Sequence, residues 1–316
     1  MRDIKNVLIC GIGAVGSIYA DKIQNYDPQS LRVLVDEERY RKYIKNPIVF
    51  NGRELNFNYI LPDDKNFKAD LIIIATKYDG LKDVINSIKN FVYDDTVILS
   101  LLNGVTSEKI IAETYGRDKL LYSYFIGHSA VRTGRTVAHD DVNTIVYGSE
   151  NSDDFENVKR VKEYFERTGI NYDIPDDIIH SLWLKYMLNV SANQTTAILR
   201  LTFGEMLAND KCMEFAINLM KEVQAVAKAE GVRNPDIMID ETVENLHKMI
   251  PEGKTSMLQD VEAGRKTEVD MFAGTMVELG IKYGIPTPYN KIVKELIEII
   301  HREQDINKAK LLIGAL

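Results

Sequence analysis

The sequence of 316 residues predicts an α/β fold in which a doubly wound parallel sheet is followed by an all-helical domain. Short apolar runs alternate with helical segments up to residue 174, whereas every long segment from Pro175 onward has helical periodicity. A glycine-rich turn joins the first apolar run to the first helical segment. We therefore expect two domains, 1–174 and 175–316, with a ligand in the cleft between them.

The expected strands of the first domain are short and apolar. The run at 71–75 is apolar throughout, as is typical of a parallel strand covered on both faces. Such runs place strands at 6–10, 31–35, 69–75, 95–101 and 119–127, and helices at 14–25, 78–90 and 107–115, the last with Ser107 as its N-cap. Other expected elements are a hairpin at Asn51-Gly52 between 48–50 and 55–57, a strand pair through 135–139 and 143–148, a helix at 153–168 and a strand at 170–174.

The second domain is expected to be all helical. Thr287 and Pro288 begin its last helix as N-cap and first helical residue. The helices are expected at 176–199, 205–230, 236–249, 267–283 and 288–302.

The glycine-rich turn has the spacing of a dinucleotide-binding fingerprint. It follows a predicted strand, opens a helix and consists of Gly11, Ile12, Gly13, Ala14, Val15 and Gly16. Gly11 permits a tight turn, Gly13 allows a pyrophosphate to approach the backbone, and Gly16 lets the helix pack closely on the strand. The second predicted strand ends at an acidic residue, Asp36. This context indicates a Rossmann-type domain, and the alternative is a structural glycine turn in an unrelated α/β domain.

Two further loops follow the carboxyl ends of predicted strands, where open α/β sheets bind ligands. Lys77, after Thr76, is a candidate for binding a phosphate or the cofactor ribose, or else it is a solvated loop lysine. Asn103, before Gly104, is a candidate for orienting the nicotinamide or a substrate oxygen, or else it belongs to a simple turn.

The first long helix of the second domain carries a polar row on an apolar background. Lys185, Asn189 and Asn193 are four residues apart, so an ammonium and two carboxamides share one face. A helix this apolar is expected to be largely buried, and a buried lysine without a partner is a candidate for chemistry. The alternative is that Lys185 extends to the surface while the asparagines pair with neighbouring helices.

Composition excludes several classes of protein. The sequence has no apolar stretch of about 18 residues and no basic-plus-apolar leader, so we expect neither a membrane span nor a secretion signal. Cys10 and Cys212 are expected to be reduced, buried thiols of a cytoplasmic protein. No His/Cys cluster has metal-ligand spacing, so no metal is expected. The net charge of −8 argues against nucleic acid, and an anionic substrate would need local positive groups.

Taken together, these residues resemble the ketopantoate reductase (2-dehydropantoate 2-reductase) family over nearly the whole chain. The motifs that carry the resemblance are the glycine turn, Thr76-Lys77, Leu102-Asn103-Gly104, Asp177-Ile178, Leu182-Trp183-Leu184-Lys185 with Asn189 and Asn193, Ser256-Met257-Leu258-Gln259-Asp260, Gly264-Arg265, Thr267-Glu268-Val269-Asp270 and Gly284-Ile285-Pro286-Thr287-Pro288. The block from Ser256 to Asp270, combined with the Lys–Asn–Asn helix, is highly specific.

The resemblance implies hydride transfer from a nicotinamide cofactor to the C2 carbonyl of a branched 2-oxo acid, reducing 2-dehydropantoate (ketopantoate) to pantoate in pantothenate and coenzyme A biosynthesis. By the same resemblance Lys185 donates a proton to the carbonyl oxygen, and Glu268 hydrogen-bonds near that lysine and the cofactor ribose. Asn189, Asn193 and Ser256 then bind the substrate, and Asn103 touches both ligands. For Glu268 and Ser256, the alternative is helix N-terminal chemistry, with Thr267 as a cap.

The chain departs from the family pattern at two positions near this predicted site. Gln194 stands where the family usually has proline, and Phe203 stands where a substrate-contacting asparagine is expected. The loss of an amide and the gain of an aromatic ring would make the pocket less polar. This bears on the identity of the substrate rather than on the type of reaction, so a 2-oxo acid other than ketopantoate is the main alternative. A non-catalytic nucleotide-binding regulator is a further alternative, although it predicts a broken Lys–Asn–Glu set. The apolar helical domain is compatible with a homodimer.

For the cofactor, the family default and this sequence point in different directions. Family members generally prefer NADP(H), with an arginine at the end of the second strand facing the 2′-phosphate. That position is Asp36 here, and a carboxylate that binds the ribose hydroxyls favours NAD(H). Arg39 and Arg41 are near enough in sequence to restore phosphate binding, and Glu37 and Glu38 oppose them. The alternative is that Asp36 only caps the next helix.

Overall fold

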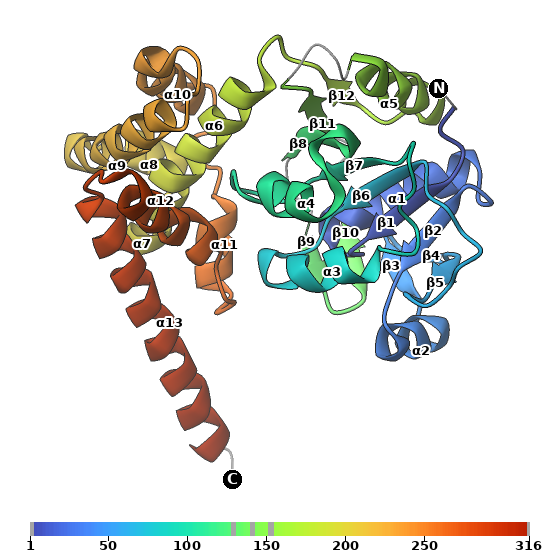
Figure 1. Ribbon diagram of the computed structural model, residues 1–316. Coiled ribbons are helices and arrows are strands. Elements are labelled where there is room, and N and C mark those ends of the chain that lie inside the picture. Colours follow the sequence, from blue (N-terminus) through green and yellow to red (C-terminus); the bar gives the residue numbers. More distant parts are fainter. Residues whose placement is uncertain (1–2, 128–130, 140–142, 151–154, 315–316) are drawn as a thin grey trace. The chain divides into compact units, whose positions relative to one another are not determined.

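The computed structural model describes residues 3–127, 131–139, 143–150 and 155–314. The chain divides into two compact units, Met1–Ile178 and Ile179–Leu316 (Figure 1). The first unit contains the β-sheets, and the described part of the second is helical. The predicted fold class, a Rossmann-type α/β domain followed by a helical domain, is confirmed.

The central sheet of the first unit has eight strands in the order β12-β11-β8-β7-β6-β1-β2-β5. They are β1 (Val7–Cys10), β2 (Leu31–Leu34), β5 (Tyr59–Ile60), β6 (Leu71–Ile74), β7 (Val97–Ser100), β8 (Leu120–Gly127), β11 (Asn143–Gly148) and β12 (Tyr172–Asp173). The neighbouring strands β5, β2, β1, β6, β7 and β8 are mutually parallel, and β11 is antiparallel to β8. Because β2 and β6 lie on opposite sides of β1, the strand order reverses at β1, the point where such sheets bind ligands.

Helices cover both faces of this sheet because alternate strand residues point to opposite sides. One face packs on α1 (Ala14–Tyr26) and α5 (Phe155–Thr168), and the other on α3 (Leu81–Ser87) and α4 (Ser107–Tyr115). The first core includes Val7, Ile9, Ile18 and Phe165, and the second includes Leu8, Cys10, Ile85 and Ile111. Cys10 and Cys212 are both buried and free, as predicted, and burial raises the pKa of the Cys10 thiol.

A separate sheet of four strands has the order β4-β3-β10-β9. Its strands are β3 (Ile48–Phe50), β4 (Arg53–Leu55), β9 (Val131–Thr133) and β10 (Thr136–Ala138). The Asn51-Gly52 hairpin is confirmed, with φ of 46° and 82° at its two residues. The expected pairing of 135–139 with 143–148 is wrong, because β10 pairs with β9 and β3 while β11 pairs with β8. Alternation identified these strands, but their partners depend on tertiary packing.

Several local details of the first unit differ from the prediction. The helix α2 (Glu37–Lys45) was expected only under the alternative that Asp36 caps a helix, because Tyr43 is its one buried residue and leaves almost no apolar periodicity. The expected helix at 78–90 is a short 3₁₀ turn, η1 (Tyr78–Gly80), followed by α3. A second 3₁₀ turn, η2 (Arg117–Lys119), precedes β8. Thr106, rather than Ser107, is the N-cap of α4, and the Ser107 hydroxyl bonds to Ser100 at 2.9 Å instead. The start of the predicted helix 153–168 lies outside the described residues.

The second unit is built from helices. They are α6 (Ile178–Leu188), η4 (Asn189–Asn193), α7 (Gln194–Leu199), α8 (Phe203–Leu207), α9 (Asp210–Ala229), η5 (Pro235–Ile237), α10 (Met238–His247), α11 (Ser256–Glu262), η6 (Asp270–Gly274), α12 (Thr275–Tyr283) and α13 (Pro288–Gly314). The expected helix at 205–230 is broken, because Asn209 begins α9 by accepting from the Lys211 and Cys212 N–H groups. The short helix α11 was not predicted.

Two of these segments, η4 and η6, are π-helical. The first lies within the long helix predicted at 176–199, between α6 and α7. The second replaces the beginning of the helix predicted at 267–283 and leads directly into α12. Isolated π-turns inside helices are often found at functional sites, and η4 begins and ends at Asn189 and Asn193.

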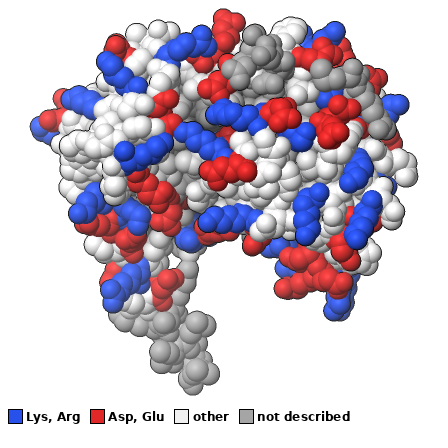
Figure 2. All heavy atoms as spheres, viewed as in Figure 1, with Lys and Arg blue, Asp and Glu red and all other residues white. Residues whose placement is uncertain are grey.

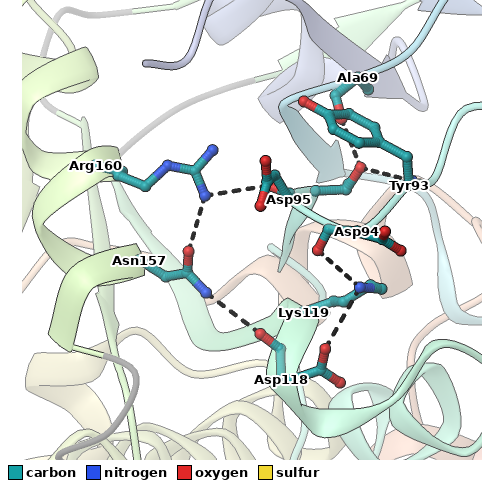
Figure 3. A network of polar contacts seen from close by, with 9 residues as sticks. Ala69, Tyr93, Asp94, Asp95, Asp118, Lys119, Asn157 and Arg160 are labelled. Carbon is teal, nitrogen blue, oxygen red and sulfur yellow. Dashed lines mark hydrogen bonds and ion pairs between the residues drawn. The ribbon is translucent and has the colours of Figure 1, made fainter. Parts of the chain in front are cut away.

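Polar side chains join α5 to the amino ends of β7 and β8 (Figure 3). Arg160 of α5 donates to the Asp95 carbonyl oxygen at 3.1 Å and to the Asn157 side chain at 2.9 Å. Asn157 in turn donates to the Asp118 carbonyl oxygen at 3.3 Å, and Lys119 donates to the Asp94 carbonyl oxygen at 2.9 Å. This network fixes the edge of the sheet opposite the carboxyl ends of its parallel strands.

The same edge contains a fully buried carboxylate, Asp70. One of its oxygens accepts from the Lys5 and Asn6 N–H groups at 2.9 and 2.8 Å, and the other accepts from the Tyr93 hydroxyl. The carbonyl of Asp70 accepts from the Val97 N–H at 3.0 Å. Asp70 therefore aligns the beginnings of β1, β6 and β7, and so sets the register of the strands whose other ends carry the candidate site.

Asp70→Ala should lower the free energy of unfolding by about 2–4 kcal/mol, because two backbone N–H groups and the half-buried Tyr93 hydroxyl lose the buried acceptor that they share. Urea denaturation would measure this. Asp94→Ala is the matched control, since that aspartate is exposed and should change stability by less than about 0.5 kcal/mol. Equal stabilities of the two variants would contradict this role for Asp70.

Candidate active site

The glycine turn between β1 and α1 is shaped by two close backbone contacts. Gly11 has a φ of 96°, and a Cβ there would lie 2.6 Å from the Ala75 carbonyl oxygen. A Cβ on Gly16 would lie 1.9 Å from the Gly11 carbonyl oxygen. At Gly13, by contrast, a Cβ would meet nothing within 4 Å. Two of the glycines are therefore required by packing, and the third leaves open space in front of the turn.

The beginning of α1 faces this open space with groups suited to an anion. No side chain caps the helix, and its first turn contains no acidic residue. The N–H groups at the start of a helix have no partner within it and carry partial positive charge. The open position at Gly13 and the uncapped helix fit the diphosphate of a dinucleotide.

The other predicted residues of this unit lie on loops that leave the same edge of the sheet. Cys10, Leu34, Ile74 and Ser100 are the last residues of four neighbouring strands and are in register. Gly11, Asp36, Lys77 and Asn103 follow within one to three residues of these strand ends. Lys77 is exposed, and Asn103 is half-buried. Their contacts with a ligand stay predictions.

Asp36 is the N-cap of α2. Its Oδ1 accepts from the Arg39 N–H at 2.6 Å, and its Oδ2 pairs with the Arg39 guanidinium at 2.6 Å. The cap on which the alternative interpretation of Asp36 depends is therefore present, and whether Asp36 also acts on the cofactor stays a prediction. Arg41 pairs with Glu37 instead, at 2.6 Å.

Arg132 of β9 is a residue beside the turn that the sequence did not point to. Its guanidinium donates to the Ile12 carbonyl oxygen, to the Gly134 carbonyl oxygen at 3.0 Å and to the Tyr43 hydroxyl at 3.3 Å. Burial raises the pKa of nearby Tyr59 to about 12, and the Arg132 charge opposes that rise. Arg132 therefore joins the small sheet and α2 to the turn and places a positive charge there. Nothing in the sequence around it indicates this contact.

In the second unit, the predicted row lies across α6 and η4. Asn189 and Asn193 are buried, and Lys185 is half-buried rather than fully enclosed. The Asn193 side chain donates to the Asn189 side chain at 3.0 Å, so the two amides form one polar unit. This bond confirms that Asn189 and Asn193 share a helix face, whereas the place of Lys185 on that face and the role of all three in binding a substrate stay predictions.

Ser256 and Glu268 belong to or adjoin two segments, α11 and η6, that both contact η4. Ser256 is the first residue of α11 and is exposed, while the preceding Thr255 caps α11 and bonds to the Thr196 hydroxyl at 2.8 Å. Glu268 is half-buried and precedes η6. Thr267 does not act as a side-chain cap, because its hydroxyl has no partner among the described residues and its N–H donates to His301 Nε2 at 3.3 Å.

Charges of both signs lie together on one face of the molecule (Figure 2). Figure 2 shows basic and acidic side chains interspersed over the face it draws. Among residues 3–127, 131–139, 143–150 and 155–314, no group of three or more His, Cys, Asp or Glu could hold a metal ion. Within the same ranges, no helix is both long and apolar enough to cross a membrane.

The parallel sheet, the glycine turn and the Lys–Asn–Asn helix together are typical of a nucleotide-dependent oxidoreductase. The family model for ketopantoate reductase PanE/ApbA matches residues 7–152, and the model for the ketopantoate reductase PanE/ApbA C terminal part matches residues 177–301. The chain belongs to the ketopantoate reductase family.

Individual relatives support the same grouping at modest identity. The 2-dehydropantoate 2-reductase of Pyrococcus horikoshii is 28% identical over 298 residues, covering 92% of this chain and 96% of that protein. A D-mandelate dehydrogenase, solved with NADH and anilino(oxo)acetate, has a TM-score of 0.83 at 22% identity, over 95% of this chain and 99% of that one. A dimeric ketopantoate reductase from Staphylococcus aureus has a TM-score of 0.73 at 19% identity, with the same coverage. The two solved structures establish similarity of fold.

Gly13→Ala should weaken NADH or NADPH binding by at least about tenfold, or 1.4 kcal/mol, because its methyl group occupies the open space before the turn. Its effect on folding should stay below about 1 kcal/mol, since φ of −77° suits alanine. Gly16→Ala should instead destabilise the fold by about 2–4 kcal/mol through the clash with Gly11. Nucleotide fluorescence titration and urea denaturation separate the two effects. Wild-type affinity in Gly13→Ala would refute the proposed diphosphate position.

Proposed function

We propose that this protein reduces the C2 carbonyl of a small 2-oxo acid with a nicotinamide cofactor, and that the acid is 2-dehydropantoate, reduced to pantoate. That step would place the protein in pantothenate and coenzyme A biosynthesis. The observation that carries the proposal is the polar row of Lys185, Asn189 and Asn193, two of them buried and hydrogen-bonded, on a helix whose remaining surface is mostly apolar. Membership of the family and the names of relatives such as the Pyrococcus horikoshii enzyme support the reaction.

In this proposal each residue has a distinct task. The Asn189 and Asn193 carboxamides and the Ser256 hydroxyl bind the oxygens of the acid, and Asn103 orients the groups that react. A bound nicotinamide cofactor supplies the hydride. As negative charge develops on the ketone oxygen, the Lys185 ammonium stabilises it and donates the proton. Glu268 accepts hydrogen bonds from the lysine and the cofactor ribose. Because Lys185 is half-buried, its amine stays within reach of solvent and can be protonated again after it has donated the proton.

A second candidate substrate class is a 2-oxo acid with a less polar side chain than ketopantoate. Phe203 begins α8, where the family has asparagine, and its N–H donates to the Gly253 carbonyl oxygen at 3.1 Å. Its ring lies against Gly253, in the loop just before Ser256. The similarity in fold to a D-mandelate dehydrogenase solved with an anilino-substituted oxoacetate favours including aromatic acids. Absorbance at the NAD(P)H band with a panel of 2-oxo acids separates the two candidates.

The cofactor is proposed to be NADP(H) or NAD(H), with Asp36 favouring NAD(H). Residues of the turn from Gly11 to Gly16 would bind the diphosphate, and Lys77 would meet a ribose or phosphate oxygen. A homodimer in the cytoplasm is the proposed state, supported by the two buried free thiols and by the dimeric relative.

Lys185→Ala should reduce turnover of the 2-oxo acid by about two to four orders of magnitude, the usual effect of losing a general acid. The affinity for NAD(P)H should barely change, because the cofactor residues lie in the other unit, apart from Glu268. Lys211→Ala, an 87% exposed lysine of α9, is the control and should leave turnover unchanged. Steady-state kinetics would rule out the assignment if Lys185→Ala kept more than about a tenth of wild-type turnover.

The wild-type protein should use NADH at least as well as NADPH, because a carboxylate at Asp36 repels a 2′-phosphate. Removing the charge should shift the ratio of kcat/KM values toward NADPH. Asp36→Ala also removes the α2 cap, so Asp36→Ser, which retains a capping oxygen, isolates the charge effect. A wild-type preference for NADPH above about tenfold, or roughly 1.4 kcal/mol, would overturn this prediction.

A further inference from the structure

The two π-helical segments of the second unit are joined by one side chain, Gln194, which is fully buried. Its amide nitrogen Nε2 donates to the Val190 carbonyl oxygen at 2.7 Å, within η4. Its Oε1 accepts from the Ala273 N–H at 3.1 Å, within η6. Both segments carry or adjoin predicted site residues: Asn189 and Asn193 in η4, and Glu268 two residues before η6.

Both hydrogen bonds of Gln194 replace bonds that the π-turns remove. In a regular α-helix, the backbone N–H of residue 194 would donate to the Val190 carbonyl oxygen. Here the Gln194 N–H donates to the Ser191 carbonyl oxygen, and the side chain of the same residue reaches Val190 instead. A side-chain amide thus restores the contact that its own main chain has given up.

The second π-turn leaves a donor that Gln194 satisfies. The Gly274 N–H donates to the Val269 carbonyl oxygen at 3.0 Å, a bond spanning five residues. In a regular helix that oxygen would be the acceptor for the Ala273 N–H. Ala273 is completely buried, so its N–H needs another acceptor, and Gln194 Oε1 provides it. One carboxamide therefore matches an acceptor in one bulge and a donor in the other.

The position of Gln194 relates this link directly to the polar row. Residues 186, 190 and 194 form one row along the helix, and residues 185, 189 and 193 form the row beside it. Gln194 ends the first of these rows, and Tyr186 begins it. The Tyr186 hydroxyl donates to the Phe272 carbonyl oxygen at 2.8 Å, so we call residues 186, 190 and 194 the anchored row. Both ends of the anchored row thus bind η6, and the adjacent row of Lys185, Asn189 and Asn193 is held at a fixed rotation about the helix axis.

We propose that Gln194 is a positioning residue that fixes the two π-turns relative to each other, and thereby sets the placement of the Asn189–Asn193 pair and of Glu268. Its effect on catalysis rests on the function proposed above, whereas the link itself does not. Gln194 touches neither substrate nor cofactor in this proposal. It acts through the backbone of the segments that carry the residues contacting those ligands.

The test uses Gln194→Met, which keeps the length and burial of the side chain and removes both hydrogen bonds. Ser191→Ala is the matched control, because Ser191 is equally buried in η4 and, among the residues described, its hydroxyl donates to the carbonyl oxygens of Met187 and Leu188 in its own helix. Amide hydrogen exchange at Ala273 should accelerate at least about tenfold in Gln194→Met and stay near wild type in Ser191→Ala. An unchanged Ala273 exchange rate in Gln194→Met would overturn the link.

Kinetics test the consequence for the site. In Gln194→Met, kcat/KM for the 2-oxo acid should fall at least about tenfold, with both a higher KM and a lower kcat, while the Kd for NAD(P)H changes less than about threefold. Wild-type kcat/KM in a variant with accelerated Ala273 exchange would overturn the positioning role. If Gln194→Met does not fold, exchange in the wild-type protein decides: an Ala273 amide as labile as an exposed one overturns the proposal, and strong protection supports it. If the wild type reduces no 2-oxo acid, the proposed function fails, and the exchange measurements still decide the link.

Discussion

The approach of α1 to β1 is the constraint on which the candidate cofactor site depends. Where Gly16 passes the Gly11 carbonyl there is no room for even one methyl group, and a methyl group on Gly11 would likewise clash with Ala75, the residue after β6. These contacts bring the start of α1 to the point where the strand order reverses. The helix N-terminus, the open space at Gly13 and the loops after β2, β6 and β7 are consequences of that approach. Arg132 strengthens the arrangement from outside by binding the Ile12 carbonyl.

Much of the fold could be predicted because its signals are local. Apolar runs located the parallel strands, helical periodicity located the second unit, and Asn51-Gly52 located a hairpin whose φ angles only such residues adopt readily. The errors concern elements whose cause is not local. The strand at 136–138 pairs with β9 and β3 because of packing, and α2, almost entirely exposed, shows no apolar stripe. The break at Asn209 arises from a cap inside an otherwise continuous helical pattern.

For the candidate site, the sequence predicted which residue types take part and which helix face some of them share. It did not predict the backbone geometry or the distant side chains that position them. Four-residue spacing placed Asn189 and Asn193 on one face, and their mutual hydrogen bond agrees with it. The same spacing could not show that the helix changes to π geometry between them, because a π-turn has no signature of its own in apolar periodicity. Nor could it show that Arg132, more than a hundred residues from the glycine turn, reaches back to it. Contacts of that kind depend on the folded topology.

The shared carboxamide at position 194 has a consequence for how this chain can change during evolution. The two bulges lie about 80 residues apart in sequence, yet an acceptor in one and a donor in the other are satisfied by the same side chain. Proline, which the resemblance to the family leads us to expect at this position, offers neither the backbone N–H nor the amide. Exchanging Gln194 for proline would therefore leave the Ala273 N–H buried and unsatisfied unless the segment 270–274 changed as well. Substitutions at these two places should be epistatic, and lineages with proline at this position should show a compensating acceptor or a different helical geometry near residue 273.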